Sequence, residues 1–184
     1  MSKAKSITAA HQPETQRKLQ PKTALFLVIV AVIIVAVVVL RLAFGGGSIE
    51  SVLETYYEGL YATTNIEAMA GCLPEGEKRE RFELVFTMGG VSNMADGYHM
   101  QAEEWVGENI KVDVNIVSQE KPTAGALNVA RAENSAIQSV VPVVFDVRLT
   151  GDNATHTLRG QTIMYRIGGE WFIEDYNIVL GFVS

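Results

Sequence analysis

The sequence predicts an α+β protein in which one N-terminal transmembrane helix precedes a folded domain. Three observations support this class. Residues 24–40 form an unbroken apolar run. Residues 49–105 repeat their apolar positions at helical spacing, whereas residues 110–176 alternate apolar and polar positions as strands do. A group of helices followed by a group of strands is typical of α+β domains.

The apolar run predicts a membrane-spanning helix over residues 23–44. At ~1.5 Å per residue this segment crosses the ~30 Å hydrocarbon layer, where a helix satisfies its own backbone hydrogen bonds. A cleaved signal peptide is the main alternative. Its apolar region is usually only ~7–15 residues long, however, and Arg41 and Leu42 disrupt the small-residue pattern of the nearest cleavage site. We therefore expect an uncleaved anchor whose partner is the lipid bilayer.

The charge distribution predicts the orientation of that helix. Residues 1–23 contain five basic residues and one acidic residue, whereas residues 45–184 contain nine basic and twenty acidic residues. The positive-inside rule therefore places the N-terminus in the cytoplasm and the acidic part outside. The expected segments are a disordered basic cytoplasmic tail (1–22), the anchor (23–44), a glycine-rich linker (45–48) and an extracytoplasmic domain (49–184).

The first half of the domain predicts a set of helices. Ser48 is a suitable N-cap, and apolar residues recur at helical spacing from Ile49 to Tyr61. Three more helices are expected: residues 66–71, a stretch from residue 77 to Gly89-Gly90 with Phe82, Val85 and Phe86 turned inward, and a stretch containing Met94, Tyr98, Met100 and Trp105.

The second half predicts a mainly antiparallel sheet. Strands are expected over residues 110–116, 141–149, 158–167 and 170–176, with a polar helix or loop over 127–135. Gly168-Gly169 is typical of a two-residue hairpin turn. The apolar phase changes near Gly160, which predicts a β-bulge at that residue. Pro142 lacks a backbone donor, so we expect it at a strand start or on a sheet edge.

Two motifs carry a resemblance to a known family. The first helix contains the paired tyrosines of Val52–Tyr57, and the last hairpin runs through Gly168–Ile173. Over about residues 48–180 the chain resembles the nuclear transport factor 2-like, or cystatin-like, superfamily, and in particular its membrane-anchored bacterial extracytoplasmic domains of uncharacterised function. The resemblance implies a cone, in which helices pack on a curved, mainly antiparallel sheet.

The resemblance also implies a cavity inside the cone. The residues expected to line it are Tyr56, Tyr57, Tyr61, Trp105 and Trp171. The alternative interpretation of the tyrosines is core packing with the hydroxyl at the rim. Ketosteroid-isomerase-like members use an acidic base and an oxyanion donor inside the cone. No residue of this chain matches those roles, and Asp146 lies on the polar side of its strand and is expected to face solvent.

The residues that could carry chemistry do not form a constellation. The candidates are His11, His99 and His156, the single cysteine Cys72, and the acidic pairs Glu103-Glu104 and Glu174-Asp175. The histidines lack metal-ligand spacing, the cysteine lies in an apolar context, and adjacent carboxylates face different ways, as on a solvated surface. We therefore expect no catalytic residue, no metal and no cofactor.

These observations lead to three hypotheses. The leading one is a membrane-tethered, non-enzymatic domain that contacts an envelope protein or a small ligand. The second is a self-associating scaffold subunit of an envelope assembly similar to type IV secretion systems. The third is a small-molecule binder or enzyme that uses the cone cavity. Nucleic acid is excluded as a partner because the excess of acidic residues repels phosphate backbones.

Overall fold

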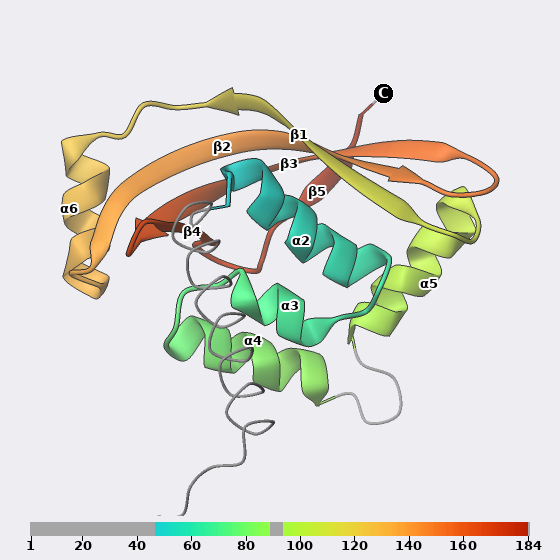
Figure 1. The fold of residues 1–184 in the computed structure, drawn as a ribbon, viewed down its shortest axis with the longest axis horizontal. Helices are drawn as coiled ribbons and strands as arrows, with labels where there is room; N and C mark the ends of the chain where they lie inside the picture. Colours follow the sequence, from blue (N-terminus) through green and yellow to red (C-terminus); the bar gives the residue numbers. More distant parts are fainter. Residues whose placement is uncertain (1–46, 89–93, 184) are drawn as a thin grey trace, which may run out of the picture. The chain divides into compact units, whose positions relative to one another are not determined.

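The computed structural model describes residues 47–88 and 94–183 (Figure 1). The expected tail and transmembrane helix, residues 1–22 and 23–44, lie outside the described residues, as does the first half of the linker. Within the two described stretches, no helix is long and apolar enough to cross a bilayer.

The described part is an α+β domain with a curved antiparallel sheet, as the sequence predicts (Figure 1). The sheet lies over α2, and α3 and α4 lie farther from it on the same side. The elements in order are α2 (Ile49–Tyr61), α3 (Ile66–Gly71), α4 (Glu77–Thr87), α5 (Met94–Val106), β1 (Lys111–Gln119), α6 (Ala124–Glu133), β2 (Ile137–Thr150), β3 (Thr155–Ile167), β4 (Glu170–Ile173) and β5 (Leu180–Phe182).

Helix α2 is the central helix of the domain, and its predicted bounds are confirmed. It begins at the predicted cap, where the Ser48 hydroxyl accepts a hydrogen bond from the Ser51 amide at 3.1 Å. Its apolar stripe is buried against β1, β4, α3 and α5. Gly59 lets α3 approach closely, because an added Cβ would lie 2.6 Å from Cγ of Met69.

The three other predicted helices of the first half are also present. Helix α4 buries Phe82 and Phe86, while Val85 is half-buried. Helix α5 buries a different face from the one that carries the large apolar residues by which it was predicted. Ala95, Ala102 and Val106 face the core, whereas the exposed residues include Met94 and Met100. Small residues on the buried face let α5 pack closely against its neighbours, so the larger apolar residues that predicted this helix lie toward its rim.

The sheet has the strand order β1-β2-β3-β4, and β5 also pairs with β3. Strands β4 and β5 share one edge of β3: β4 pairs with residues 164–167 and β5 with residues 158–160. The predicted hairpin is confirmed, since Gly168 and Gly169 have φ angles of 61° and 90° and join Ile167 to Glu170.

The predicted bulge at Gly160 is wrong. Gly160 pairs with Phe145 in an unbroken β2–β3 register, and the shift in that ladder lies between Ile137 and Ser139. The apolar phase changes because α6 covers the opposite face of the sheet at this end. A second, smaller core forms there, and its buried residues are Ala130, Ile137, Val140 and Tyr165. Strand β3 therefore contributes residues to both cores, and its register with β2 does not change at Gly160.

Pro142 lies inside β2 and not at a strand start. The reason for that expectation, its missing backbone N–H donor, still applies. The Pro142 carbonyl accepts a hydrogen bond from the Glu120 amide at 3.0 Å, so its donorless nitrogen faces the β1 side. Strand β1 ends at Gln119, immediately before that position. The missing donor thus coincides with the point at which β1 leaves the sheet.

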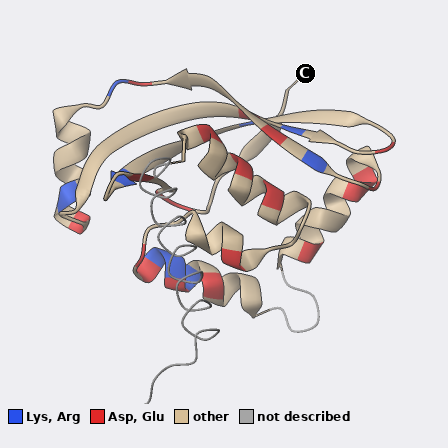
Figure 2. Cartoon of the chain, viewed as in Figure 1, with Lys and Arg blue, Asp and Glu red and all other residues tan. Residues whose placement is uncertain are grey.

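The face of the sheet opposite α2 carries paired charges. Arg159 donates two hydrogen bonds to Asp146, at 2.7 and 2.8 Å, and Arg148 donates to Asp113 at 3.0 Å. The hydrogen bonds from Arg159 lower the pKa of Asp146 below its ordinary value. Asp146 thus lies away from the main core, as predicted. Figure 2 shows blue and red residues together on the sheet, whereas α2 and α5 carry red ones alone.

Candidate functional site

An aromatic hollow of about 460 Å³ lies where α2 and α5 meet the C-terminal segment. Eight of its lining residues are aromatic. The lining consists of Tyr56, Tyr57, Leu60, Tyr61, Phe86, Tyr98, Gln101, Trp105, Leu158, Tyr176, Ile178, Val179, Leu180 and Phe182. The hollow thus combines residues from both helices with residues near the end of the chain.

The helical period of α2 places its three tyrosines at this site. Tyr56, Tyr57 and Tyr61 are all buried, and Tyr57 is only 1% exposed. Tyr57 packs against Phe145 of β2, with ring centroids 5.6 Å apart, and stacks on Tyr61 at 6.1 Å. The tyrosines therefore belong to the core and also form the inner wall of the hollow, so the two interpretations of them are compatible.

The hydroxyls of the two innermost tyrosines differ in their partners. The Tyr56 hydroxyl donates to the Tyr176 carbonyl at 3.4 Å. The Tyr57 hydroxyl is buried and has no hydrogen-bond partner among the described residues. Leaving a buried polar group unsatisfied costs about 1–3 kcal/mol, so proteins rarely retain one that has no use.

Burial also fixes the protonation of these phenols. It raises the pKa of Tyr61 to about 12 and raises the pKa of Tyr56 and of Tyr57 well above the ordinary value. The phenolate forms are disfavoured because the surrounding side chains replace water. At neutral pH each hydroxyl therefore keeps its proton and remains a hydrogen-bond donor.

The mouth of the hollow is apolar. Trp105 meets Phe182 edge to face at 5.1 Å, and Tyr61 meets Tyr98 at 6.2 Å with ring planes 85° apart. Phe182 is 61% exposed and Val179 is 85% exposed. A hollow that is aromatic inside and apolar at its rim favours a ligand whose surface is largely apolar.

Polar side chains are few in the lining. Apart from the tyrosine hydroxyls and the Trp105 indole, Gln101 is the single polar side chain among the described residues of the wall, which include no carboxylate, imidazole, amine or thiol. Among these described residues, the tyrosines are the groups that could take part in proton transfer.

The two tryptophans predicted to line the cavity lie in different places. Trp105 lines the aromatic hollow, but Trp171 does not. Trp171 lies on β4, where the guanidinium of Arg166 is 5.8 Å from its ring. Tyr176 and Phe182 were missed as lining residues because the C-terminal segment has no clear period and its strand, β5, is only three residues long.

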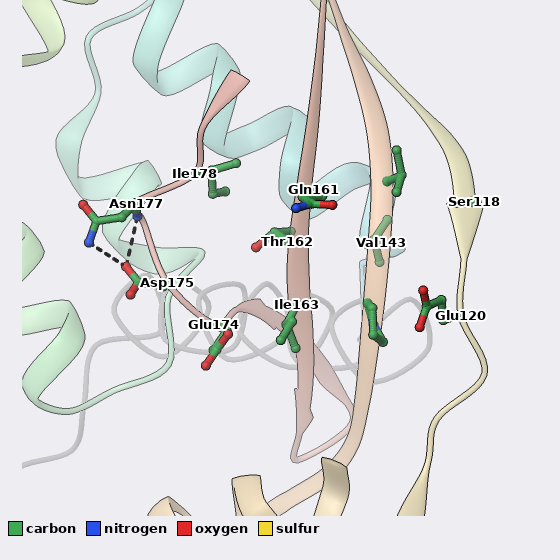
Figure 3. Close-up of a pocket in the computed structure, with 12 residues that line it drawn as sticks. Ser118, Glu120, Val143, Gln161, Thr162, Ile163, Glu174, Asp175, Asn177 and Ile178 are labelled. Atoms are coloured by element: carbon green, nitrogen blue, oxygen red, sulfur yellow. Dashed lines mark hydrogen bonds between the residues drawn. The ribbon is translucent and has the colours of Figure 1, made fainter. Parts of the chain in front are cut away.

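A second hollow, of about 300 Å³, includes residues from the opposite face of the sheet (Figure 3). Glu174 and Asp175 follow β4 on one side of it, and Glu120 follows β1 on the other. Glu174, which was expected on a solvated face, is partly exposed and also has partners: it accepts hydrogen bonds from the Tyr165 hydroxyl at 3.0 Å and from Lys78 at 3.4 Å. Asp175 accepts from Asn177. These partners give the two carboxylates a structural role.

Of the remaining candidates, Cys72 and His99 make contacts within the fold, whereas His11 lies outside the described residues. Cys72 is buried as predicted, its Sγ lies 3.4 Å from the carbonyls of Val52 and Ala68, and burial raises its pKa to about 12. Nδ1 of His99 lies 2.6 Å from the Tyr61 carbonyl. Within residues 47–88 and 94–183, no group of three or more His, Cys, Asp or Glu residues could hold a metal ion.

Comparisons of the chain with protein families, curated proteins and solved structures gave no match. The function is therefore inferred from the geometry of the aromatic hollow and from the sequence of the segment that precedes the domain.

Proposed function

We propose that the protein is a membrane-anchored extracytoplasmic domain that binds a small molecule with a largely apolar surface in the aromatic hollow and does not transform it. The observation that carries this proposal is the aromatic hollow itself, of about 460 Å³, whose inner wall includes Tyr57. The Tyr57 hydroxyl has no partner among the described residues and is covered by other atoms of the protein. A ligand with one hydrogen-bond acceptor would satisfy this hydroxyl after the side chains that cover it have moved, while its apolar part contacts the rings.

The size and chemistry of the hollow support this ligand class. Small-molecule sites typically enclose ~300–1,000 Å³ and combine an apolar wall with a few polar groups, and the hollow of about 460 Å³ fits this pattern. The protonated phenols and Gln101 can orient a ligand, and the absence of a described carboxylate, imidazole, amine or thiol in the wall favours binding over catalysis.

The resemblance to the nuclear transport factor 2-like superfamily is part of the proposal. A curved antiparallel sheet over helices suits a cone, and the hollow lies beside the central helix, where a cone would hold a ligand. A scaffold that self-associates through its sheet is less favoured. The sheet face opposite α2 carries ion pairs, Arg148 with Asp113 and Arg159 with Asp146, in place of a broad apolar surface.

The proposed anchor makes a prediction about topology. Protease added to intact spheroplasts should digest the domain that follows residue 48, because that domain lies outside the cytoplasmic membrane. A cytoplasmic protein in the same spheroplasts serves as the control for integrity. If the domain remained intact until the spheroplasts were lysed, the proposed orientation would be wrong.

The proposed contact with Tyr57 predicts opposite effects on stability and on affinity. In Tyr57→Phe the unsatisfied hydroxyl is removed, so the unliganded protein should gain about 1 kcal/mol of unfolding free energy. The same variant should bind a ligand that has a carbonyl group about 5–10-fold more weakly, because the hydrogen bond is lost.

The affinity can be measured by fluorine NMR on the full chain in uncharged maltoside detergent. The probes are 4-fluoroacetophenone and 4-fluoroethylbenzene, which differ in the carbonyl. Tyr57→Phe should weaken binding of the ketone alone, whereas Tyr165→Phe, a change outside the hollow, should leave both affinities unaltered. Equal affinity of wild type and Tyr57→Phe for the ketone would refute the proposed contact.

A further inference from the structure

The Asp, Glu, Lys and Arg residues of the two helices that form the inner wall of the aromatic hollow are all acidic. Helices α2 and α5 provide half of the lining residues. Between them they carry six acidic residues and neither Lys nor Arg (Figure 2). The acidic residues are Glu50, Glu54, Glu58, Asp96, Glu103 and Glu104. An acidic flank of this kind raises the local concentration of cations and repels anions.

The aromatic wall of the hollow also favours cations, for a different reason. An aromatic ring has a negative face, and a cation placed over such a face is attracted by the ring quadrupole. The edge-to-face pairs Trp105–Phe182 and Tyr61–Tyr98 hold ring planes close to perpendicular. Rings set at right angles form the corner of a box, which is the arrangement that aromatic cages use for quaternary ammonium groups.

No described lining residue carries a positive charge that would offset the preference for cations. The wall contains neither Lys nor Arg, so an anionic ligand would find no opposite charge there. The Tyr57 hydroxyl, covered in this structure, has no partner among the described residues and would become available to a second polar group of the ligand once the side chains that cover it have moved. The acidic flank, the perpendicular rings and the free hydroxyl are independent observations, and they are compatible with one ligand.

We infer that the natural ligand of the aromatic hollow is a free organic cation that joins an alkylated ammonium group to a hydrogen-bond acceptor. The inference rests on the proposed binding function and adds the charge of the ligand to it. The ammonium group lies against the rings near the mouth, where Trp105 and Phe182 meet. The acceptor reaches the Tyr57 hydroxyl after the side chains that cover this hydroxyl have moved.

Three probes of nearly equal shape test whether the ligand must carry a positive charge. Choline, its neutral carbon analogue 3,3-dimethylbutan-1-ol and the anion 3,3-dimethylbutanoate are titrated against the full chain in uncharged maltoside detergent, with saturation-transfer NMR as the readout. Choline should bind on the order of tenfold more tightly than the neutral alcohol, and the anion should bind least. An alcohol that binds as tightly as choline, or an absence of choline binding, overturns the inference.

Two variants test whether the preference for choline comes from the rings of the hollow or from the general acidity of the domain. Trp105→Leu should lower the preference for choline over the alcohol severalfold, because a ring of the proposed cage is lost. Trp171→Leu removes an indole outside the hollow and should leave the preference unchanged. If both variants lost the preference equally, or neither did, the rings of the hollow would not be its source and the inference would fail.

A fourth probe distinguishes a free cation from a lipid headgroup. Glycerophosphocholine carries the same ammonium group next to a phosphate, which the acidic flank repels, so it should bind more weakly than choline. Binding as tight as that of choline would overturn the assignment to a free cation. These outcomes are separable from the fluorine NMR result: if the ketone binds through Tyr57 while choline does not, the binding function stands and the charge assignment fails.

Discussion

Replacing Phe82 with alanine is expected to lower the unfolding free energy of the domain by about 3–5 kcal/mol. Phe82 is fully buried. Its ring centroid lies 4.3 Å from that of Phe86, 5.4 Å from that of Tyr176 and 6.3 Å from that of Tyr56. Alanine would leave a cavity among three rings, and the backbone of α4 cannot collapse into it without losing other contacts. Domains of this size are stable by only ~5–15 kcal/mol, so the loss is large.

The matched control lies on the same helix. Leu84 is 58% exposed, so Leu84→Ala should change the unfolding free energy by less than about 0.5 kcal/mol. Urea unfolding of the full chain in detergent, followed by tryptophan fluorescence, measures both variants. Equal losses in Phe82→Ala and Leu84→Ala would mean that α4 does not pack on the domain as described.

Phe82 also connects the core to the aromatic hollow. Its partners Tyr56, Phe86 and Tyr176 are all lining residues of that hollow. Phe82 therefore supports part of the inner wall from behind without lining the hollow itself. A wall that is already packed in this way loses little entropy when a ligand binds.

The elements that could be predicted from the sequence are those whose signal is local. Helix α2 was found because a cap residue, Ser48, precedes a regular apolar stripe, and the β3–β4 hairpin was found because Gly168-Gly169 suits its turn. Both features depend on residues close together in the chain. Tertiary packing leaves helix α2 and the β3–β4 hairpin as the local sequence predicts them.

The features that could not be predicted depend on which element covers which face. The phase change in β3 suggested a bulge at Gly160, whereas the cause is α6, which lies on the other face of the sheet and buries Tyr165. In the same way, Tyr176 and Phe182 join the hollow because the chain after β4 turns back toward α5. No local pattern encodes a contact between segments that are distant in sequence.

Replacing Gly160 with valine should separate β5 from the sheet and destabilise the domain by about 1–3 kcal/mol. A Cβ at this position would lie 2.5 Å from Cδ2 of Leu180 and 2.8 Å from Cζ of Phe145. The Leu180 side chain can move, but the Phe145 ring is fully buried and packs against Tyr57. The strain is therefore relieved most easily by displacement of β5, which carries Leu180 and Phe182 of the hollow.

Gly181→Val is the matched control, because an added Cβ at Gly181 meets no atom within 4 Å although the residue also lies in β5. Hydrogen exchange of residues 176–183, measured by mass spectrometry on the full chain, should be faster in Gly160→Val and unchanged in Gly181→Val. Choline binding should fall only in the first variant, since β5 forms one wall of the site. If Gly160→Val kept wild-type exchange in this segment, the close approach of β5 to β3 would be refuted, and with it the wall that the aromatic hollow requires.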